Sequence, residues 1–161
     1  MSAIATSDHT ELIDGVEIPK PLVKKQHAFV QAFLIVFLSR TLPPRYWVAS
    51  ELNVLCGADR LVPDVTVTER SARYIDGDLA DPPLLAVEIL SPGQTIGNLF
   101  EKSDRLLKAD APMTWIIWPE RRKAWMYTGS ELFEASEALR SPLPAGESIE
   151  VALKDLWAEL D

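Results

Sequence analysis

The feature that most constrains this chain is a carboxylate in the middle of an apolar run. Glu88 lies within residues 84–90, and all its neighbours in that run are aliphatic. Dense apolar runs of this length are typical of central strands buried on both faces of a sheet. An isolated carboxylate there is costly to ionise. Glu88 must therefore pair with a cation, bind a metal ion or keep its proton, and both a structural ion pair and a metal or catalytic role stay open.

Asp64 is a second acidic candidate, in a strand predicted over residues 61–68. Because successive side chains of a strand point to opposite faces, Asp64 lies on the face opposite to Val65 and Val67. Taken alone, this pattern also fits a solvated strand residue, and Pro63 favours a strand start or an edge. Two carboxylates from neighbouring strands could hold one Mg²⁺, which prefers oxygen ligands and keeps several waters.

Lys102 lies on a helix predicted over residues 98–108. Asn98 as the N-cap and Glu101 three residues later make a capping-box pattern, which sets the phase of the helix. In that phase Lys102 falls on the apolar stripe, so its side chain points toward the sheet. Its ammonium either snorkels out along the edge of the core or meets the two carboxylates. There it would position the attacking water or stabilise charge on a reacting phosphate.

The hydrophobic pattern predicts an α/β fold, with a central mixed sheet of the α+β kind flanked by helices. Residues 1–10 are expected to form a flexible N-terminal arm and residues 11–161 one domain, as the chain length suggests. The predicted helices cover residues 24–40, 98–108 and 153–160. The predicted strands cover residues 11–18 with a turn at Asp14-Gly15, then 46–55, 61–68, 84–90, 114–118 and 123–128, with loops at 71–83 and 129–148.

Composition limits the classes of function. A net charge of -8 and a pI near 4.8 argue against broad, non-specific binding to nucleic acid, which needs cations that neutralise phosphates. A local basic patch stays compatible with that charge, and the candidates are Arg105, Lys108, Arg121, Arg122 and Lys123, which could also be solvated surface charges. No apolar run reaches the ~18 residues of a membrane helix, so no membrane partner is expected.

Motifs for several common chemistries are missing from the sequence. There is no GxxxxGK[ST] phosphate loop, no GxGxxG, no HExxH and no GxSxG. Two histidines and a single cysteine do not supply a zinc hydrolase. We interpret Cys56 as a small buried hydrophobe, in keeping with a reducing cytoplasm.

Several short motifs follow one another along most of the chain: Glu11-Leu12-Ile13-Asp14-Gly15, His27, Pro63-Asp64-Val65, Val87-Glu88-Ile89-Leu90-Ser91-Pro92, Glu101-Lys102, and Pro112 with Trp115 to Pro119. In this order and spacing the chain resembles a large bacterial restriction-endonuclease-like family within the PD-(D/E)XK nuclease superfamily.

The resemblance implies a role for each matching residue. Pro63-Asp64 corresponds to the "PD" element and Glu88 to the second acidic ligand, so these two carboxylates would bind Mg²⁺, or Mn²⁺ as a substitute. Leu90 occupies the place of the lysine in the short motif, and the family is similar in carrying its lysine on the following helix, at Lys102. Glu11 matches the N-terminal acid of the family. A DNA substrate and a homodimer are further expectations, since symmetric strands need symmetric sites.

The chain also departs from the family pattern. Asn98 stands where the family usually has Asp, Trp118 where it has an acidic residue, Val62 where it often has Arg, and Asp110-Ala111-Pro112 where it has Gly-Val-Pro. These changes leave the proposed metal ligands intact.

Three functions are compatible with these observations. The first is a Mg²⁺-dependent DNA endonuclease, with His27 and Ser91 as candidate substrate contacts, although a lone histidine is more often structural. The second is a catalytically inactive binding or regulatory module that keeps the nuclease fold, which the acidic charge and the changes at Asn98 and Trp118 favour. The third is a phosphodiesterase acting on RNA or small nucleotides.

Overall fold

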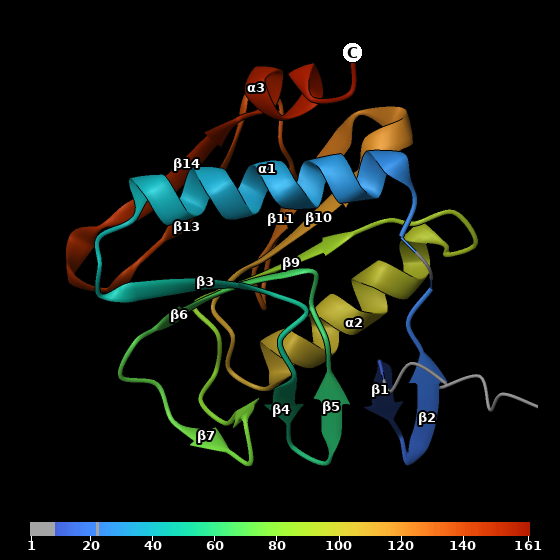
Figure 1. Ribbon diagram of the computed structural model, residues 1–161, viewed down its shortest axis with the longest axis vertical. Helices are drawn as coiled ribbons and strands as arrows, with labels where there is room; N and C mark the ends of the chain where they lie inside the picture. Colours follow the sequence, from blue (N-terminus) through green and yellow to red (C-terminus); the bar gives the residue numbers. More distant parts are fainter. Residues whose placement is uncertain (1–8, 22) are drawn as a thin grey trace, which may run out of the picture.

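A six-stranded mixed sheet runs through the middle of the protein, with helices on both faces (Figure 1). The structure is a computed structural model that describes residues 9–21 and 23–161. The strand order in the sheet is β12-β11-β10-β9-β6-β3. These strands are β3 (Tyr46–Ser50), β6 (Val65–Glu69), β9 (Leu85–Ile89), β10 (Thr114–Trp118), β11 (Lys123–Tyr127) and β12 (Leu132–Glu134). The mixed α/β architecture predicted from the sequence is confirmed.

Strand β9 lies inside this sheet, as its apolar run predicts. It pairs in parallel with β10 and antiparallel with β6. A parallel pair needs a crossover connection, and α2 (Ile96–Lys108) supplies it between β9 and β10. The crossover brings α2 against the face of the sheet on which Glu88 lies.

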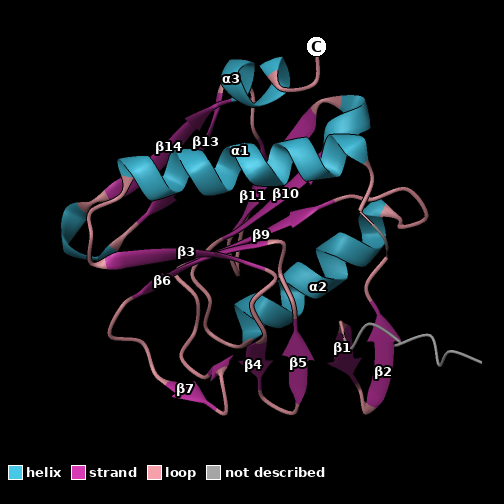
Figure 2. Ribbon diagram, viewed as in Figure 1, coloured by secondary structure: helices cyan, strands magenta, loops and turns pink. Residues whose placement is uncertain are grey.

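Helices lie on both faces of the central sheet (Figure 2), and an apolar cluster packs against each face. Helix α1 (Lys25–Thr41), α3 (Leu153–Ala158) and the hairpin of β13 (Ala138–Pro142) with β14 (Ser148–Ala152) build the first layer. Helix α2 lies on the opposite face. Within β9, Val87 packs into the α1 layer, whereas Ala86 packs into the α2 layer. Glu88 follows the alternation and faces α2.

A second, smaller sheet lies on the α2 side of the molecule (Figure 1). Its order is β2-β1-β5-β4-β8-β7, from β1 (Thr10–Ile13), β2 (Val16–Pro19), β4 (Val54–Cys56), β5 (Asp59–Leu61), β7 (Tyr74–Ile75) and β8 (Asp78–Leu79). The β1–β2 hairpin turns at Asp14-Gly15, where both residues have left-handed φ values of 51° and 77°. Two such residues are what a tight two-residue hairpin turn requires, so the predicted turn is confirmed.

Helix α2 begins two residues earlier than the sequence pattern indicates. Thr95, not Asn98, is the N-cap: its side chain accepts a hydrogen bond from the Asn98 backbone N–H. The Asn98 side chain in turn accepts from the Thr95 backbone N–H at 3.0 Å. The sequence pattern indicated Asn98 and Glu101 as the capping box. This assignment was wrong because an Asn side chain can act either at the N-cap or three residues after it. The phase of the helix is unchanged, so Lys102 still points inward.

Other boundaries differ because the chain passes between the two sheets. The strand predicted at residues 46–55 is two strands, β3 in the central sheet and β4 in the second sheet. The change of direction occurs at Glu51, whose φ is 54°. Likewise, β5 ends at Leu61 and β6 starts at Val65. The loops predicted at 71–83 and 129–148 contain short strands, β7, β8, β12 and β13. Residues 1–8 of the predicted arm lie outside the described residues, and Thr10 is already in β1.

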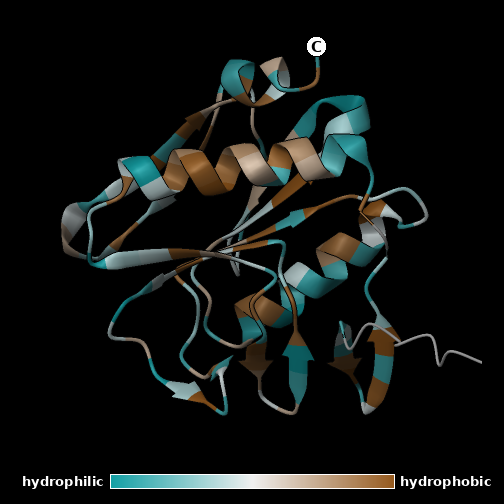
Figure 3. Cartoon of the chain, in the orientation of Figure 1, coloured by the Kyte–Doolittle hydropathy of each residue, from teal (hydrophilic) through white to brown (hydrophobic). Residues whose placement is uncertain are grey.

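Helix α1 is apolar along most of its middle (Figure 3). It ends at Thr41, two residues before Pro43-Pro44, where proline stops the helix. None of the helices formed by the described residues has the length and apolar character needed to cross a bilayer.

Candidate active site

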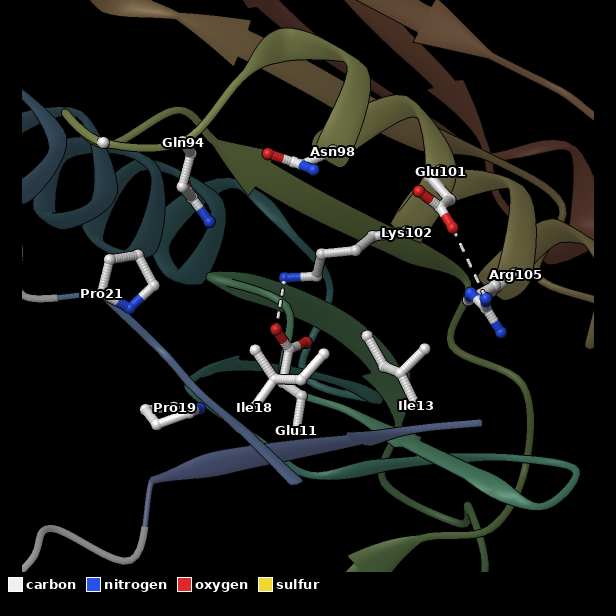
Figure 4. Close-up of a pocket in the computed structure, with 11 residues that line it drawn as sticks. Glu11, Ile13, Ile18, Pro19, Pro21, Gln94, Asn98, Glu101, Lys102 and Arg105 are labelled. Carbon is white, nitrogen blue, oxygen red and sulfur yellow. Dashed lines mark ion pairs between the residues drawn. The ribbon is translucent and has the colours of Figure 1, made fainter. Parts of the chain in front are cut away.

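Lys102 joins two acidic side chains from different sheets. Its Nζ lies 2.9 Å from Glu11 Oε1, drawn in Figure 4, and 3.0 Å from Glu88 Oε2. All three residues are buried, with exposed fractions of 5% for Glu11, 2% for Glu88 and 6% for Lys102. The ammonium therefore offsets two carboxylates that are almost completely buried.

Asp64 is held at the start of β6 by contacts to the neighbouring strand and to α1. Its Oδ2 accepts a hydrogen bond from the Ile89 backbone N–H at 2.7 Å. Its Oδ1 lies 3.0 Å from Lys20 Nζ and 3.1 Å from His27 Nε2. Both oxygens of this carboxylate thus have partners, and one of these partners is a second buried ammonium.

Sequence reasoning missed that second ammonium and its surroundings. Lys20 follows β2, and its Nζ also donates to Glu51 Oε2 and to the Val62 carbonyl, each at 2.7 Å. Glu51 in turn accepts from Gln31 at 3.1 Å and lies 2.9 Å from His9. One signal was available for this cluster, because Gln31 interrupts an otherwise apolar helix segment.

The two ion-paired groups meet at one small cavity of about 10 Å³. That volume is about the smallest that accommodates a water molecule. Its lining includes Lys20, His27, Asp64, Glu88, Ser91 and Lys102. The tertiary structure thus brings the carboxylates of Asp64 and Glu88 to a common space, with an ammonium on either side.

Burial and charge shift the pKa values of this cluster in opposite directions. Burial raises the pKa of Glu88 to about 7, despite the nearby charge of Lys102. Burial also acts to raise the pKa of Asp64, but the hydrogen bond from His27 and the charge of Lys20 outweigh it and lower the pKa to about 2. The pKa of Lys102 is raised because Glu88 and Glu11 together outweigh its desolvation. Near neutral pH the cluster therefore combines an ionised Asp64 with a Glu88 that titrates.

The chemistry of the donors fits a divalent cation that prefers oxygen. Glu88 Oε1 is buried and has no hydrogen-bond partner in the described part of the chain. A buried acceptor left unpaired is costly, and a cation would satisfy it. No three His, Cys, Asp or Glu side chains among the described residues are arranged to bind a metal ion. Two carboxylates with several waters are, however, a common arrangement for Mg²⁺.

The candidate substrate contacts lie beside this cavity. His27 is 3% exposed, and its Nδ1 has no hydrogen-bond partner among the described residues. The Ser91 backbone N–H donates to Gln94 Oε1 at 3.1 Å. Their contact with substrate stays a prediction.

A larger pocket of about 360 Å³ opens beside the Lys102–Glu11 pair (Figure 4). It lies between the β1–β2 hairpin and α2, and Gln94 and Asn98 are part of its wall. This pocket gives a ligand access to the Lys102 side of the site.

The basic residues singled out for phosphate contact are mostly engaged within the chain. Arg105 contacts Asp14 and Asp59, each at 2.9 Å. Other pairs are Lys108 with Asp104 at 2.7 Å, Arg122 with Asp161 at 2.5 Å and Lys123 with Glu134 at 3.8 Å, and Arg121 lies over the Trp118 ring at 5.6 Å. Surface pairs of this kind are weak, but they reduce the positive charge offered to a polyanion.

Comparison with known proteins adds two findings. Residues 2–160 match the model of the Uma2 family, described as "Putative restriction endonuclease". The fold is similar to a crystal structure from Anabaena variabilis ATCC 29413, described as "a putative nuclease belonging to DUF820". That likeness has a TM-score of 0.80 and 26% sequence identity, and covers 94% of this chain and 91% of the other. No curated protein matches the chain.

Proposed function

This chain belongs to the Uma2 family, and from that premise we propose that it is a metal-dependent endonuclease that hydrolyses phosphodiester bonds of DNA. The observation that carries the proposal is the convergence of Asp64, Glu88 and Lys102 on one cavity. Two carboxylates and an amine from two strands and a helix are the groups that phosphodiester hydrolysis needs. The packing of the strands and helices does not by itself require these three side chains to lie close together.

Each side chain has a distinct part in this proposal. Asp64 and Glu88 would hold Mg²⁺ or Mn²⁺, which supplies polarisation of the phosphodiester and a lowered pKa for a bound water. The Lys102 ammonium stabilises the negative charge that develops on the phosphate oxygens in the transition state. Glu11 contacts Lys102 at 2.9 Å and fixes the direction of the ammonium. Burial raises the pKa of Glu88 to about 7, and a bound cation would favour its ionised form.

A binding or regulatory module is the second candidate function. The net charge of -8 and the internal pairing of Arg105, Lys108 and Arg122 favour it, because few cations are free to contact phosphates. The same observations suit a phosphodiesterase that acts on RNA or a small nucleotide.

Two further parts of the proposal concern assembly and location. A homodimer would place two sites on the two strands of a duplex, and light scattering on the purified protein measures that state. A cytoplasmic location, where a lone cysteine stays reduced, belongs to the same proposal.

The test is calorimetric titration of Mn²⁺ together with nicking of supercoiled plasmid. We expect the wild type to bind Mn²⁺ and nick DNA, and Asp64→Asn to lose both. Asp155→Asn, an exposed position on α3, is the matched control and should behave as the wild type.

Two results would contradict the proposal in different ways. Mn²⁺ binding that survives in Asp64→Asn would remove this residue from the metal site. Binding by the wild type without cleavage of DNA, RNA or a small phosphodiester would favour the regulatory module.

A further inference from the structure

We propose that Lys20 is a tethered counter-ion that occupies the cation position beside Asp64, and that it must release this carboxylate when a divalent metal binds. The inference rests on the proposed metal site at Asp64 and Glu88. It assigns a function to a lysine outside the motifs that define the site, namely control of metal affinity.

The contacts of Lys20 are those of a bound cation. Its side chain is only 9% exposed. The Nζ lies within hydrogen-bond distance of three oxygens, namely Asp64 Oδ1 at 3.0 Å, and Glu51 Oε2 and the Val62 carbonyl at 2.7 Å each. An ammonium has three N–H donors, so every donor has a partner. All three partners are oxygen atoms, which also bind hard metal ions.

The space beside Asp64 is too small for a metal ion with its bound waters while Lys20 stays in place. The cavity between the two ammoniums has a volume of about 10 Å³, whereas Mg²⁺ usually keeps several waters. Asp64 Oδ2 is already occupied by the Ile89 backbone N–H. Oδ1 is contacted by both Lys20 and His27, so a metal ion that binds this oxygen has to displace the Lys20 ammonium from it.

Lys20 has an alternative place close by. Two of its three contacts, Glu51 and the Val62 carbonyl, do not involve a proposed metal ligand. Glu51 is 26% exposed, so the pair can move toward solvent together. Release of Asp64 then breaks one contact of the ammonium and keeps two. The Lys20 ammonium therefore stays next to the site after it leaves Asp64.

The charge of the cluster favours this exchange. Four acidic side chains, Glu11, Glu51, Asp64 and Glu88, surround two ammoniums, Lys20 and Lys102. When all of these groups are ionised, two negative charges remain in excess. A divalent cation would neutralise that excess, which remains when the charge of Lys20 is already counted.

The experiment compares Mn²⁺ affinity in the wild type, Lys20→Met and Lys154→Met by calorimetry at constant ionic strength. Methionine keeps the length of the side chain and removes the charge. Lys154 is exposed on α3, so its variant is the matched control for loss of one positive charge. We expect Lys20→Met to bind Mn²⁺ at least tenfold more tightly than the wild type, and Lys154→Met to change affinity less than twofold.

Thermal unfolding gives a readout that does not depend on cleavage. Without metal, Lys20→Met should melt below the wild type because Asp64 loses its counter-ion, and Mn²⁺ should raise its Tm more than that of the wild type. If Lys20→Met does not fold without metal, Lys20→Gln, which keeps a hydrogen-bond donor, takes its place.

The outcomes separate this inference from the proposed function. Equal or weaker Mn²⁺ affinity in the folded Lys20 variant, with a wild type that binds Mn²⁺ and nicks DNA, overturns the counter-ion inference alone. Absence of Mn²⁺ binding in both the wild type and the variant overturns the metal site and the inference together.

Discussion

At the scale of single residues, the most unusual feature is a carboxylate buried in a strand, which is stabilised by an ion pair with a buried lysine. Glu88 is 2% exposed and has Lys102 Nζ at 3.0 Å from one oxygen. Its other oxygen has no partner among the described residues. Removing one member of a buried ion pair is strongly destabilising, so stability and chemistry have to be separated in any test of Lys102.

Lys102→Met tests the chemical part of that pair. We expect Mn²⁺ still to bind, because Asp64 and Glu88 remain. Turnover on plasmid DNA should fall by about two orders of magnitude or more, as for loss of an electrostatic stabiliser. Steady-state nicking rates measure the effect, with Tm as the check on folding. Unchanged turnover in a folded variant would remove Lys102 from the mechanism.

Cys56 gives a pH-dependent prediction away from the site. It is 7% exposed, and burial raises the pKa of its thiol to about 12. The reactive thiolate is therefore scarce in the folded protein at pH 9, whereas the unfolded thiol is half ionised near its ordinary pKa of 9.0. Folding thus loses stability as pH rises above 9.

Iodoacetamide labelling followed by mass spectrometry measures this difference. At pH 8.5 the native protein should stay unlabelled under conditions that label the urea-unfolded chain completely. Rapid labelling of the native protein would show that Cys56 is accessible, contrary to its buried place at the end of β4, within the apolar cluster on the α2 side of the sheet.

At the scale of elements, α2 connects the fold to the site. It completes the crossover between β9 and β10 and carries Lys102 on its buried stripe. Its start depends on the reciprocal hydrogen bonds between Thr95 and Asn98. The capping box therefore stabilises the first turn of the helix that carries Lys102.

Thr95→Ala removes the side-chain oxygen that caps α2. The free energy of unfolding should fall by about 1 kcal/mol, the usual cost of losing a Thr cap. Urea unfolding measures it, against Ser136→Ala in the exposed loop between β12 and β13, which should change stability by less than about 0.5 kcal/mol. Equal effects at the two positions would show that the Thr95 side chain does not stabilise the helix.

At the scale of the whole molecule, the charge distribution limits how nucleic acid can bind. The chain carries 24 acidic and 16 basic residues. Arg105, Lys108 and Arg122 each have an acidic partner within the chain. Few basic side chains remain to displace counterions from DNA, so the long-range attraction between the protein and DNA is weak. Binding of DNA therefore depends on contacts at the candidate active site.

Salt dependence of binding measures this property. For a labelled DNA duplex and the Asp64→Asn variant, log K against log salt concentration should have a slope of about -3 or shallower, which corresponds to about three phosphate contacts. Fluorescence anisotropy over a range of salt concentrations gives the slope. A slope near -6 would contradict the charge argument and reveal a broad basic surface.

The features that depend on the local order of residues were predictable from the sequence. The aliphatic neighbours of Glu88 fix β9 as an inner strand, and alternation puts Glu88 on the face opposite to Val87. Helical periodicity points Lys102 inward whichever residue caps α2. The burial and direction of these two side chains follow from the strand and helix periods, and both periods can be identified from the sequence.

Only the tertiary structure decided which groups meet. Lys20 reaches Glu51 and Asp64 across 31 and 44 residues of chain. No periodic pattern records such separations, because closing loops of that length depends on how the two sheets pack. The split of β3 from β4 at the left-handed Glu51 has the same cause. The local sequence pattern predicted the two carboxylates and Lys102, whereas the position of Lys20 beside them depends on tertiary packing.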